Sequence, residues 1–464
     1  MDQLLQDAGE VGAVAVAEPR PARRNRAWSL CAAVALLWLA LSPAIQDAFH
    51  RSFSVAEPTG YPNDFPVYFL ASQIAARPAP DNLLYYPPAR GSWSVFELTV
   101  DAASPYAKFV AALRASGAPA RHAIPFITPP FSALLLAPLA RLPWQKAYLI
   151  WQFACLLMMV ASLYLALRLA DDRVTPLGLA ISPAVVLLFR PFRAMLALGN
   201  IDVAILFLWV LGAFASRRRY PTSSALCFAL GTAIKFSPIF AVPLLVLRKQ
   251  WRWVYGYVLI SGILLVLSIG ILGWHNHVVW ATQVSPSISR GLRDFNNRSL
   301  PGLILALTGL HRPAPAAPMW GLLIRTLSAV GYLGFLFWWW RQRKDSQALT
   351  LELILLPLVV LLLSPLTWTN HYVLAVPALL YMWVKSGTQP SLVSNLNLVL
   401  LTASTMFIGS VLPDSLVLAL RLPVELLLDA GWVAATGALL WVGMNMHKRS
   451  NEFAFAEGEG STCL

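Results

Sequence analysis

The chain has 464 residues, of which 58% are hydrophobic and 12% charged. Soluble domains carry about 25% charged residues, so this composition excludes a soluble globular protein. A mean hydropathy of +0.61, together with 18 Trp, 22 Phe and 34 Pro, instead indicates an all-α polytopic membrane protein.

The net charge is +13, but the basic residues stand in short clusters between apolar runs. Clusters of this kind set membrane topology, so we expect a membrane-lipid environment and no nucleic-acid partner. The four cysteines show no paired spacing in any loop: Cys31, Cys155, Cys227 and Cys463. The sequence therefore predicts neither a disulfide framework nor a zinc site.

The first predicted element is an apolar helix over residues 28–45, preceded by a basic tail, residues 1–27. Four arginines place this tail in the cytoplasm by the positive-inside rule: Arg20, Arg23, Arg24 and Arg26. Cleavage of a signal peptide after residues 42–44 is the alternative. The 18-residue run argues against it, because signal cores span about 7 to 15 residues.

A long first outer loop follows, over residues 46–125. Apolar residues between 65 and 74 mix there with polar ones, which predicts a helix lying along the membrane surface.

Further apolar runs complete a membrane-embedded region over residues 28–447, with about 12 transmembrane helices (range 10 to 13). The runs lie at 126–140, 147–167, 176–196, 200–215, 221–247, 253–273, 318–340, 349–365, 370–385, 393–412 and 416–443. A second outer loop covers residues 274–298, and a polar, disordered cytoplasmic tail covers residues 448–464.

Twelve crossings place both termini and most basic clusters in the cytoplasm. These clusters are Arg141 with Lys146, Arg190 with Arg193, Arg248 and Lys249 with Arg252, Arg341 with Arg343 and Lys344, Lys385, and Lys448 with Arg449. The exception is the cluster 217–219, which this count places outside. Two segments between 126 and 220 can therefore be half-spanning helices that line an enclosed cavity.

Ionisable residues inside apolar runs are costly, about 2.5 to 3.5 kcal/mol each, so they need a partner or a function. Lys235 is the fifteenth residue of the 221–247 run, and we favour a bound anion over snorkelling or a structural ion pair. Arg325 lies in the 318–340 run, and Asp202 opens the 200–215 run. For Glu425 and Asp429, four residues apart, we favour a structural role.

Three polar clusters are expected on the outer side: Asp64, the stretch 296–299, and the stretch 368–371. A cation for a phosphate, amide or imidazole donors and aromatic surface for a sugar ring are all present there. An anionic, sugar-bearing lipid headgroup would need this combination.

These residues belong to a set of short motifs whose order and spacing resemble a known family. The motifs are Asp64-Phe65 with Tyr68 and Tyr85, Thr128 to Phe131, Ala137 to Pro143, Gly199-Asn200, Lys235 with Pro238, Asn297 to Gly302, and Ser364 to Trp368 with His371. The chain thus resembles glycosyltransferase family 87, whose members depend on polyprenyl-phosphate sugars and have the GT-C membrane fold. The pair at 199–200, the triplet at 297–299 and the pair at 370–371 differ from the family pattern, which leaves the donor sugar open.

The resemblance implies an enzyme of the inner or plasma membrane. It transfers a sugar, usually mannose and in some members arabinofuranose, from a polyprenyl-phosphate donor to a glycan or glycolipid acceptor. Transfer takes place on the extracytoplasmic face with inversion at the anomeric carbon. A hydroxyl is a poor nucleophile, so a carboxylate within reach must take its proton, and we assign this general base to Asp64.

Cations and donors meet the charge that develops on the leaving phosphate. We assign this role to Lys235, Arg325 and His371, and substrate binding to Tyr68, Tyr85, Asn297, Arg298, Trp368 and Asn370. No cofactor is required, although a divalent cation between Asp64 and Asp81 stays open.

Two other functional classes stay open at this stage. A twelve-span secondary transporter would use Lys235 and Asp202 at the membrane midplane, but such proteins carry repeated halves and none is evident here. A flippase or ligase for lipid-linked saccharides would share the substrate chemistry and therefore many of the same residues.

Overall fold

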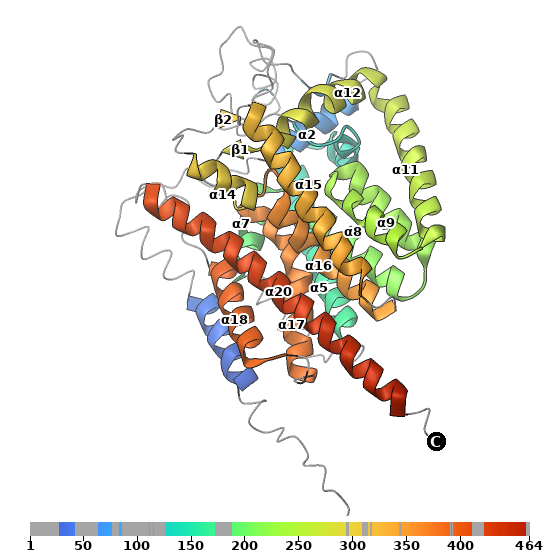
Figure 1. Ribbon diagram of the computed structural model, residues 1–464. Coiled ribbons are helices and arrows are strands. Elements are labelled where there is room, and N and C mark those ends of the chain that lie inside the picture. The colour runs from blue at the N-terminus through green and yellow to red at the C-terminus, as the bar shows by residue number, and fades with distance from the viewer. Residues whose placement is uncertain are drawn as a thin grey trace, which may run out of the picture.

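The computed structural model describes residues 27–41, 64–76, 83–85, 126–171, 188–293, 297–308, 314–315, 318–342, 346–389, 393–410 and 422–460, with residues 111, 115 and 391. This part of the chain is helical (Figure 1). Its strands form one short antiparallel ladder, in which β1 (Leu292–Arg293) pairs with β2 (Ala314–Pro315). The all-α prediction is confirmed for the described residues.

The helices described up to residue 272 are, in chain order, Ala27–Leu41, α2 (Phe65–Ala75), α4 (Ser132–Leu135), η1 (Ala137–Leu139), α5 (Trp144–Ala170), α7 (Arg190–Leu198), α8 (Asp202–Arg217), α9 (Pro221–Ile234), η2 (Ser237–Phe240), α10 (Ala241–Leu247) and α11 (Trp251–Leu272). Those that follow are α12 (Trp274–Val279), the π-helix η3 (Trp280–Val284), α13 (Ser285–Ser289), α14 (Leu300–Leu307), α15 (Pro318–Trp340), α16 (Ser346–Leu363), η4 (Thr369–Ala375), α17 (Val376–Thr388), α18 (Asn395–Ser410) and α20 (Leu422–Gly460).

Four of the described helices are long and apolar enough to cross a membrane: Trp144–Ala170, Trp251–Leu272, Met319–Trp340 and Leu426–Arg449. Large apolar side chains on the first three are exposed in many places, as expected of helices that face lipid. The membrane character is thus supported, while the number of about twelve crossings stays a prediction.

The run 126–140 was expected to cross the membrane, and this prediction is wrong. The segment forms only the four-residue α4 and the three-residue η1. Pro129, Pro130 and Pro138 explain the outcome, because proline removes a backbone donor and clashes with the preceding helical turn.

The run 221–247 is not one helix but a helical hairpin. Helix α9 ends at Ile234, the chain reverses through residues 235–237, and η2 and α10 lead back. The two arms approach closely, since a Cβ added to Gly231 would lie 3.0 Å from the Pro238 Cγ. The turn before α9 and the turn after α10 therefore lie at the same end, where Arg219 and Lys249 line one cavity.

That common end holds the 217–219 cluster and the cluster of Arg248, Lys249 and Arg252, and we call it the basic end. Arg217 donates to the carbonyls of Arg168 and Leu169 at the end of α5, at 2.9 and 2.6 Å. Arg248 donates to the Trp339 carbonyl at the end of α15, at 2.7 Å. The prediction that the 217–219 cluster and Arg248 lie on opposite sides of the membrane is therefore wrong. The reason is that the 221–247 segment forms a hairpin, whose two arms start and finish at the same end of the protein.

The opposite end of α5 lies near Asp64, since the Trp144 and Phe65 ring centroids are 5.0 Å apart. Arg141 and Lys146 are therefore at that end and not at the basic end, contrary to prediction. The physical reason is the missing crossing at 126–140, which reverses the direction in which α5 runs.

Helix α2 forms where an amphipathic helix was predicted, but it does not lie exposed along a surface. All of its residues except Gln73 are buried. The Ser72 hydroxyl donates to the Ala133 carbonyl at 2.6 Å, which attaches α2 to α4. Because α2 carries few polar side chains on any face, it packs inside the protein, against α4 and η1.

Helix α20 continues to Gly460, beyond residue 448, where a tail without regular structure was expected. It packs on α16 and α18 and crosses the whole molecule in Figure 1. Its Asp429 forms an ion pair with Arg298, both buried. Asp429 thus has the structural role that we favoured.

Candidate functional site

A cavity of about 360 Å³ lies away from the basic end, where six segments meet. These segments are the start of α2, the stretch 127–129, the turn before α8, the tip of the 221–247 hairpin, the stretch 280–289 and the stretch 364–371. Its polar lining side chains are Asp64, Tyr68, Thr128, Asn200, Lys235, Ser237, Trp280, Ser285, Ser289, Ser364, Trp368 and His371.

The turn before α8 depends on a glycine. Gly199 ends α7 in the left-handed conformation, with φ +64°. A Cβ at this position would lie 2.6 Å from the Phe65 Cβ, so any other residue would clash with the start of α2. The glycine lets the turn approach α2 and places Asn200 next to Asp64.

Asn200 joins two buried carboxylates. Its Nδ2 donates to Asp64 Oδ2 at 2.6 Å, and its Oδ1 accepts from the Asp202 backbone N–H at 2.8 Å. All three residues are at most 3% exposed. The amide therefore has a fixed orientation and presents its donor to the Asp64 carboxylate.

Burial raises the pKa of Asp64 to about 6, because removal from water disfavours the charged form. The hydrogen bond from Asn200 and the Lys235 ammonium lower this pKa, and the Asp202 carboxylate raises it. A carboxylate with a pKa near 6 is ionised at neutral pH and is a stronger base than an ordinary aspartate. These are the properties that proton abstraction from a hydroxyl requires.

Asp202 contacts three polar side chains next to the cavity: Lys235, Asn370 and His371. It pairs with the Lys235 ammonium and accepts a hydrogen bond from Asn370 Nδ2 at 3.1 Å. His371 Nε2 lies 3.5 Å from the same carboxylate. Because the Trp368 backbone N–H donates to His371 Nδ1 at 3.2 Å, the neutral imidazole carries its proton on Nε2.

Lys235 stands at the reversal of the hairpin, immediately after α9 ends. Its side chain is 24% exposed, whereas its partner Asp202 is fully buried. An ammonium has three donors, so binding to Asp202 leaves others for a ligand. The broken helix thus brings a lysine from within an apolar run to a cavity.

Two donors in the cavity lining have no hydrogen-bond partner among the described residues, although both atoms are buried. They are Ser237 Oγ and Trp368 Nε1. Unpaired buried donors are costly, so such atoms mark positions that a polar ligand can satisfy. The wall beside them includes the π-helix η3, a rare form that is frequent at functional sites.

The structure brings half of the predicted site residues to this cavity: Asp64, Lys235, His371, Tyr68 and Trp368. Asn370 lies behind them as a partner of Asp202. Tyr85 donates to the Thr128 carbonyl at 2.5 Å and supports the wall from behind. Asn297 holds the 364–367 segment, since its side chain bonds to the Pro365 carbonyl and the Thr367 N–H.

Arg298 is fully buried in its ion pair with Asp429 and does not line the cavity. Arg325 lines a neighbouring apolar cavity and donates to the Gly321 carbonyl of its own helix. Neither residue is brought together with Asp64.

Two central residues of the site, Asn200 and Asp202, were not assigned to it from the sequence. Both had a signal: Asn200 follows a glycine in one of the family motifs, and Asp202 is a carboxylate at the start of an apolar run. Their role required knowledge of which distant residues they contact, Asp64 and Lys235.

No group of three or more His, Cys, Asp or Glu residues suited to hold a metal ion occurs among the described residues. Asp81, the second candidate for a bridging cation, lies outside the described residues. The absence of a required cofactor therefore stays a prediction.

The chain is similar to known proteins. The sequence profile described as glycosyltransferase family 87 matches residues 126–365, which is 240 of the 464 residues. This range contains the turn before α8, the hairpin with Lys235 and the start of the 364–371 segment.

Similar curated proteins include a Mycobacterium tuberculosis polyprenol-phosphate-mannose-dependent alpha-(1-2)-phosphatidylinositol mannoside mannosyltransferase. It is 25% identical over 275 residues, covering 55% of this chain and 61% of the relative. A phosphatidylinositol pentamannoside mannosyltransferase from Mycolicibacterium smegmatis is 26% identical over 280 residues, covering 57% and 62%. The matches span about three fifths of the length of these relatives. Because the family profile covers more than half of the chain, this protein belongs to glycosyltransferase family 87.

Proposed function

We propose that this protein is a GT-C-type glycosyltransferase that transfers mannose from a polyprenyl-phosphate donor to a hydroxyl of a glycan or glycolipid acceptor. The observation that carries the proposal is one cavity lined both by Asp64 and by the Lys235 and His371 pair. Group transfer from a phosphate ester to a hydroxyl needs a base and a phosphate-binding group in one space. The names of the similar mannosyltransferases support the choice of donor.

In this mechanism the acceptor oxygen attacks the anomeric carbon while the Asp64 carboxylate takes the hydroxyl proton. The bond between the anomeric carbon and the phosphate oxygen breaks, and polyprenyl phosphate leaves with the electron pair. Attack opposite the leaving group inverts the anomeric carbon. Tyr68 and Trp368, also in the lining, supply aromatic surface for the sugar.

The leaving phosphate binds the Lys235 ammonium and the His371 Nε2–H, with Ser237 Oγ as a further donor. Asp202 keeps the Lys235 ammonium and the neutral His371 imidazole in place and balances the charge of Lys235 when the site is empty. Fixed donors that face the developing charge lower the barrier without reorganising during the reaction.

An apolar groove continues from the cavity and suits the polyprenyl chain. A second cavity, of about 390 Å³, shares Phe240, Val360, Ser364 and Pro365 with the first. A third shares Leu333 with the second and is lined only by apolar residues of α10 and α15. The three form a path from the hairpin tip along α10 and α15, which exposes much of its surface as a lipid-facing helix does.

We place the basic end in the cytoplasm, since Arg217 to Arg219, Arg248, Lys249 and Arg252 gather there. The cavity then opens on the extracytoplasmic side.

The test is an assay of the purified protein in nanodiscs with polyprenyl-phosphate mannose and polyprenyl-phosphate arabinofuranose offered in parallel. The acceptors are host lipid extract and purified phosphatidylinositol mannosides. The proposal predicts mannosylated product in the mannose arm. Transfer of arabinofuranose alone would show that the donor assignment is wrong, and no transfer from either donor would remove the proposed function.

A further inference from the structure

A basic cavity lies at the opposite end from the site. Its volume is about 500 Å³, and it lies between the α8–α9 turn and the α10–α11 turn. Arg219, Arg248, Lys249 and Arg252 line it, and its described lining contains no Asp or Glu. These turns form the base of the same hairpin whose tip carries Lys235.

The two turns have the same unusual backbone. Arg219 and Lys249 adopt the left-handed conformation, with φ values of 61° and 55°. Each ends its helix in a Schellman motif: the Tyr220 N–H bonds to the Ala215 carbonyl and the Gln250 N–H to the Leu245 carbonyl, both at 2.9 Å. Glycine is the favoured residue at this position, so two cations occupy places where their backbone is strained.

The charges in this cavity are of two kinds. Arg248 is buried and fixed by Glu352 and by the Trp339 carbonyl, so it forms a rigid inner wall. Arg219, Lys249 and Arg252 have exposed side chains and no ion pair with a carboxylate among the described residues. The rim of the cavity therefore offers three cations to an anion.

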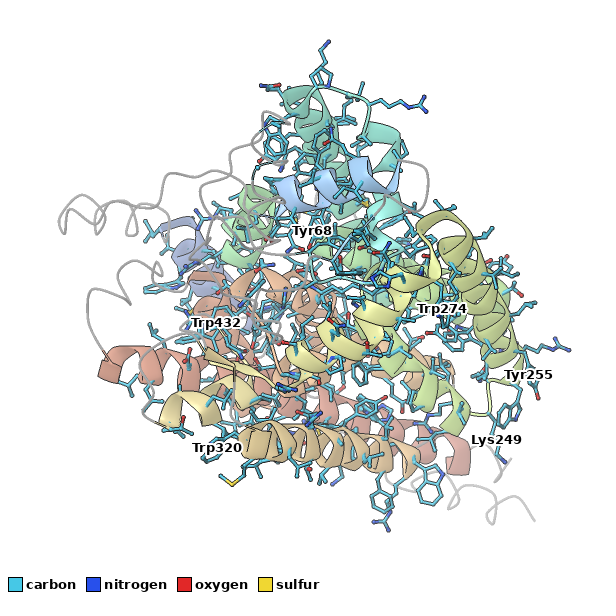
Figure 2. All side chains as sticks on the ribbon, turned by 90° about the horizontal axis from the view of Figure 1, so that it is seen from above. Tyr68, Lys249, Tyr255, Trp274, Trp320 and Trp432 are labelled. Carbon is cyan, nitrogen blue, oxygen red and sulfur yellow. The ribbon has the colours of Figure 1, made fainter. Side chains whose placement is uncertain are left out.

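The surroundings of the cavity point to a lipid as the source of that anion. Tyr220 is 64% exposed, Trp251 48% and Tyr255 70%. Exposed Trp and Tyr beside basic residues are typical of the level of lipid headgroups. Figure 2 shows Lys249 and Tyr255 at the periphery of the molecule, and α11 above them is largely exposed along its length.

We propose that this cavity binds the phosphate of an anionic phospholipid headgroup, in the leaflet opposite the candidate active site. Arg219, Lys249 and Arg252 bind the phosphate, and the acyl chains lie along α11. Basic pockets between helices near a membrane surface recognise anionic headgroups in this way. The ligand neutralises these three cations, which have no carboxylate partner among the described residues.

The test measures the relative association of spin-labelled phosphatidylglycerol and phosphatidylcholine with the full-length protein in nanodiscs. The double variant Arg219→Gly with Lys249→Gly removes two charges while supplying the residue that the backbone favours. We expect its preference for phosphatidylglycerol to fall about 25-fold, since each cation near the surface contributes about fivefold. A matched control, Arg341→Gln with Lys385→Gln, removes two charges that do not line the cavity, and its preference is expected to fall much less than that of the glycine variant.

A second readout separates binding from folding. In pure phosphatidylcholine the glycine variant is expected to unfold at the same or a higher temperature than the wild type, because the strain is relieved. Phosphatidylglycerol is expected to stabilise only the wild type and the control. An unchanged preference in the glycine variant, or an equal loss in the control, would overturn the proposal. Displacement of the labelled lipid by 10 mM inorganic phosphate would assign the cavity to a soluble anion instead.

Discussion

Replacement of Asn200 by alanine tests how the site sets the basicity of Asp64. The Asn200 amide donates to the carboxylate at 2.6 Å and lowers the pKa of Asp64, which burial raises to about 6. A hydrogen bond to a charged group contributes about 1.5 to 3 kcal/mol. One pKa unit corresponds to about 1.4 kcal/mol, so the variant is expected to raise the pKa of Asp64 by about one to two units.

The sign of the effect follows from the role of Asp64. A general base works only when ionised, so activity falls as the pH decreases through its pKa. We expect the acid limb of kcat/KM near pH 6 in the wild type. In Asn200→Ala it moves to between about pH 7 and 8, so that activity lost at pH 7 returns at higher pH.

The assay is mannose transfer from polyprenyl-phosphate mannose, measured from pH 5 to 9 in nanodiscs. Gln152→Ala is the matched control, because Gln152 Nε2 donates to the Leu196 carbonyl at 2.9 Å and supports the same turn without contacting Asp64. Its acid limb is expected to stay at the wild-type position. If Asn200→Ala loses activity equally at every pH, Asn200 has only a structural role and the reasoning is refuted.

Three further predictions concern positions around the site. Arg298→Ala leaves Asp429 buried without its cation and is expected to lower the free energy of unfolding by about 3 to 5 kcal/mol. Adding Asp429→Ala is expected to restore much of this stability. A substrate-binding role of Arg298 would instead predict normal stability and a raised KM. Ala329→Trp narrows the apolar groove and is expected to raise the KM for long-chain donors more than for short-chain donors; an equal effect on both would exclude the groove as the path of the lipid chain. Gly199→Ala is expected to lower the thermal unfolding midpoint and the transfer rate together, because its Cβ would lie 2.6 Å from the Phe65 Cβ; unchanged values for both would contradict the close approach of the turn to α2.

The sequence predicted the class of the fold and the main chemical groups of the site. Composition and apolar runs indicated a helical membrane protein, and Asp64, Lys235 and His371 line one cavity although they are far apart in the chain. Lys235 was recognisable because a charge inside an apolar run is costly. The break of the helix next to it, where α9 ends and η2 begins with Pro238, was not predicted.

Apolar length alone did not predict the direction of the helices. The runs 126–140 and 221–247 are hydrophobic enough to cross a membrane, but prolines break both of them. Each missing crossing reverses the predicted membrane orientation of every helix that follows it. The missing crossing at 126–140 therefore changed the side of the membrane predicted for Arg141. Asn297 and Arg298 were recognisable as polar residues, but only the packing shows that they bind other protein groups.

The central claim is that Asp64 acts as the base in a site that also binds the donor phosphate. The most direct measurement is single-turnover transfer of labelled mannose by the wild type and Asp64→Asn, with donor binding determined for both in the same nanodiscs. We expect the variant to bind the donor with nearly unchanged affinity and to transfer mannose about 10² to 10⁴ times more slowly. Transfer within tenfold of the wild-type rate at equal donor occupancy would contradict the account.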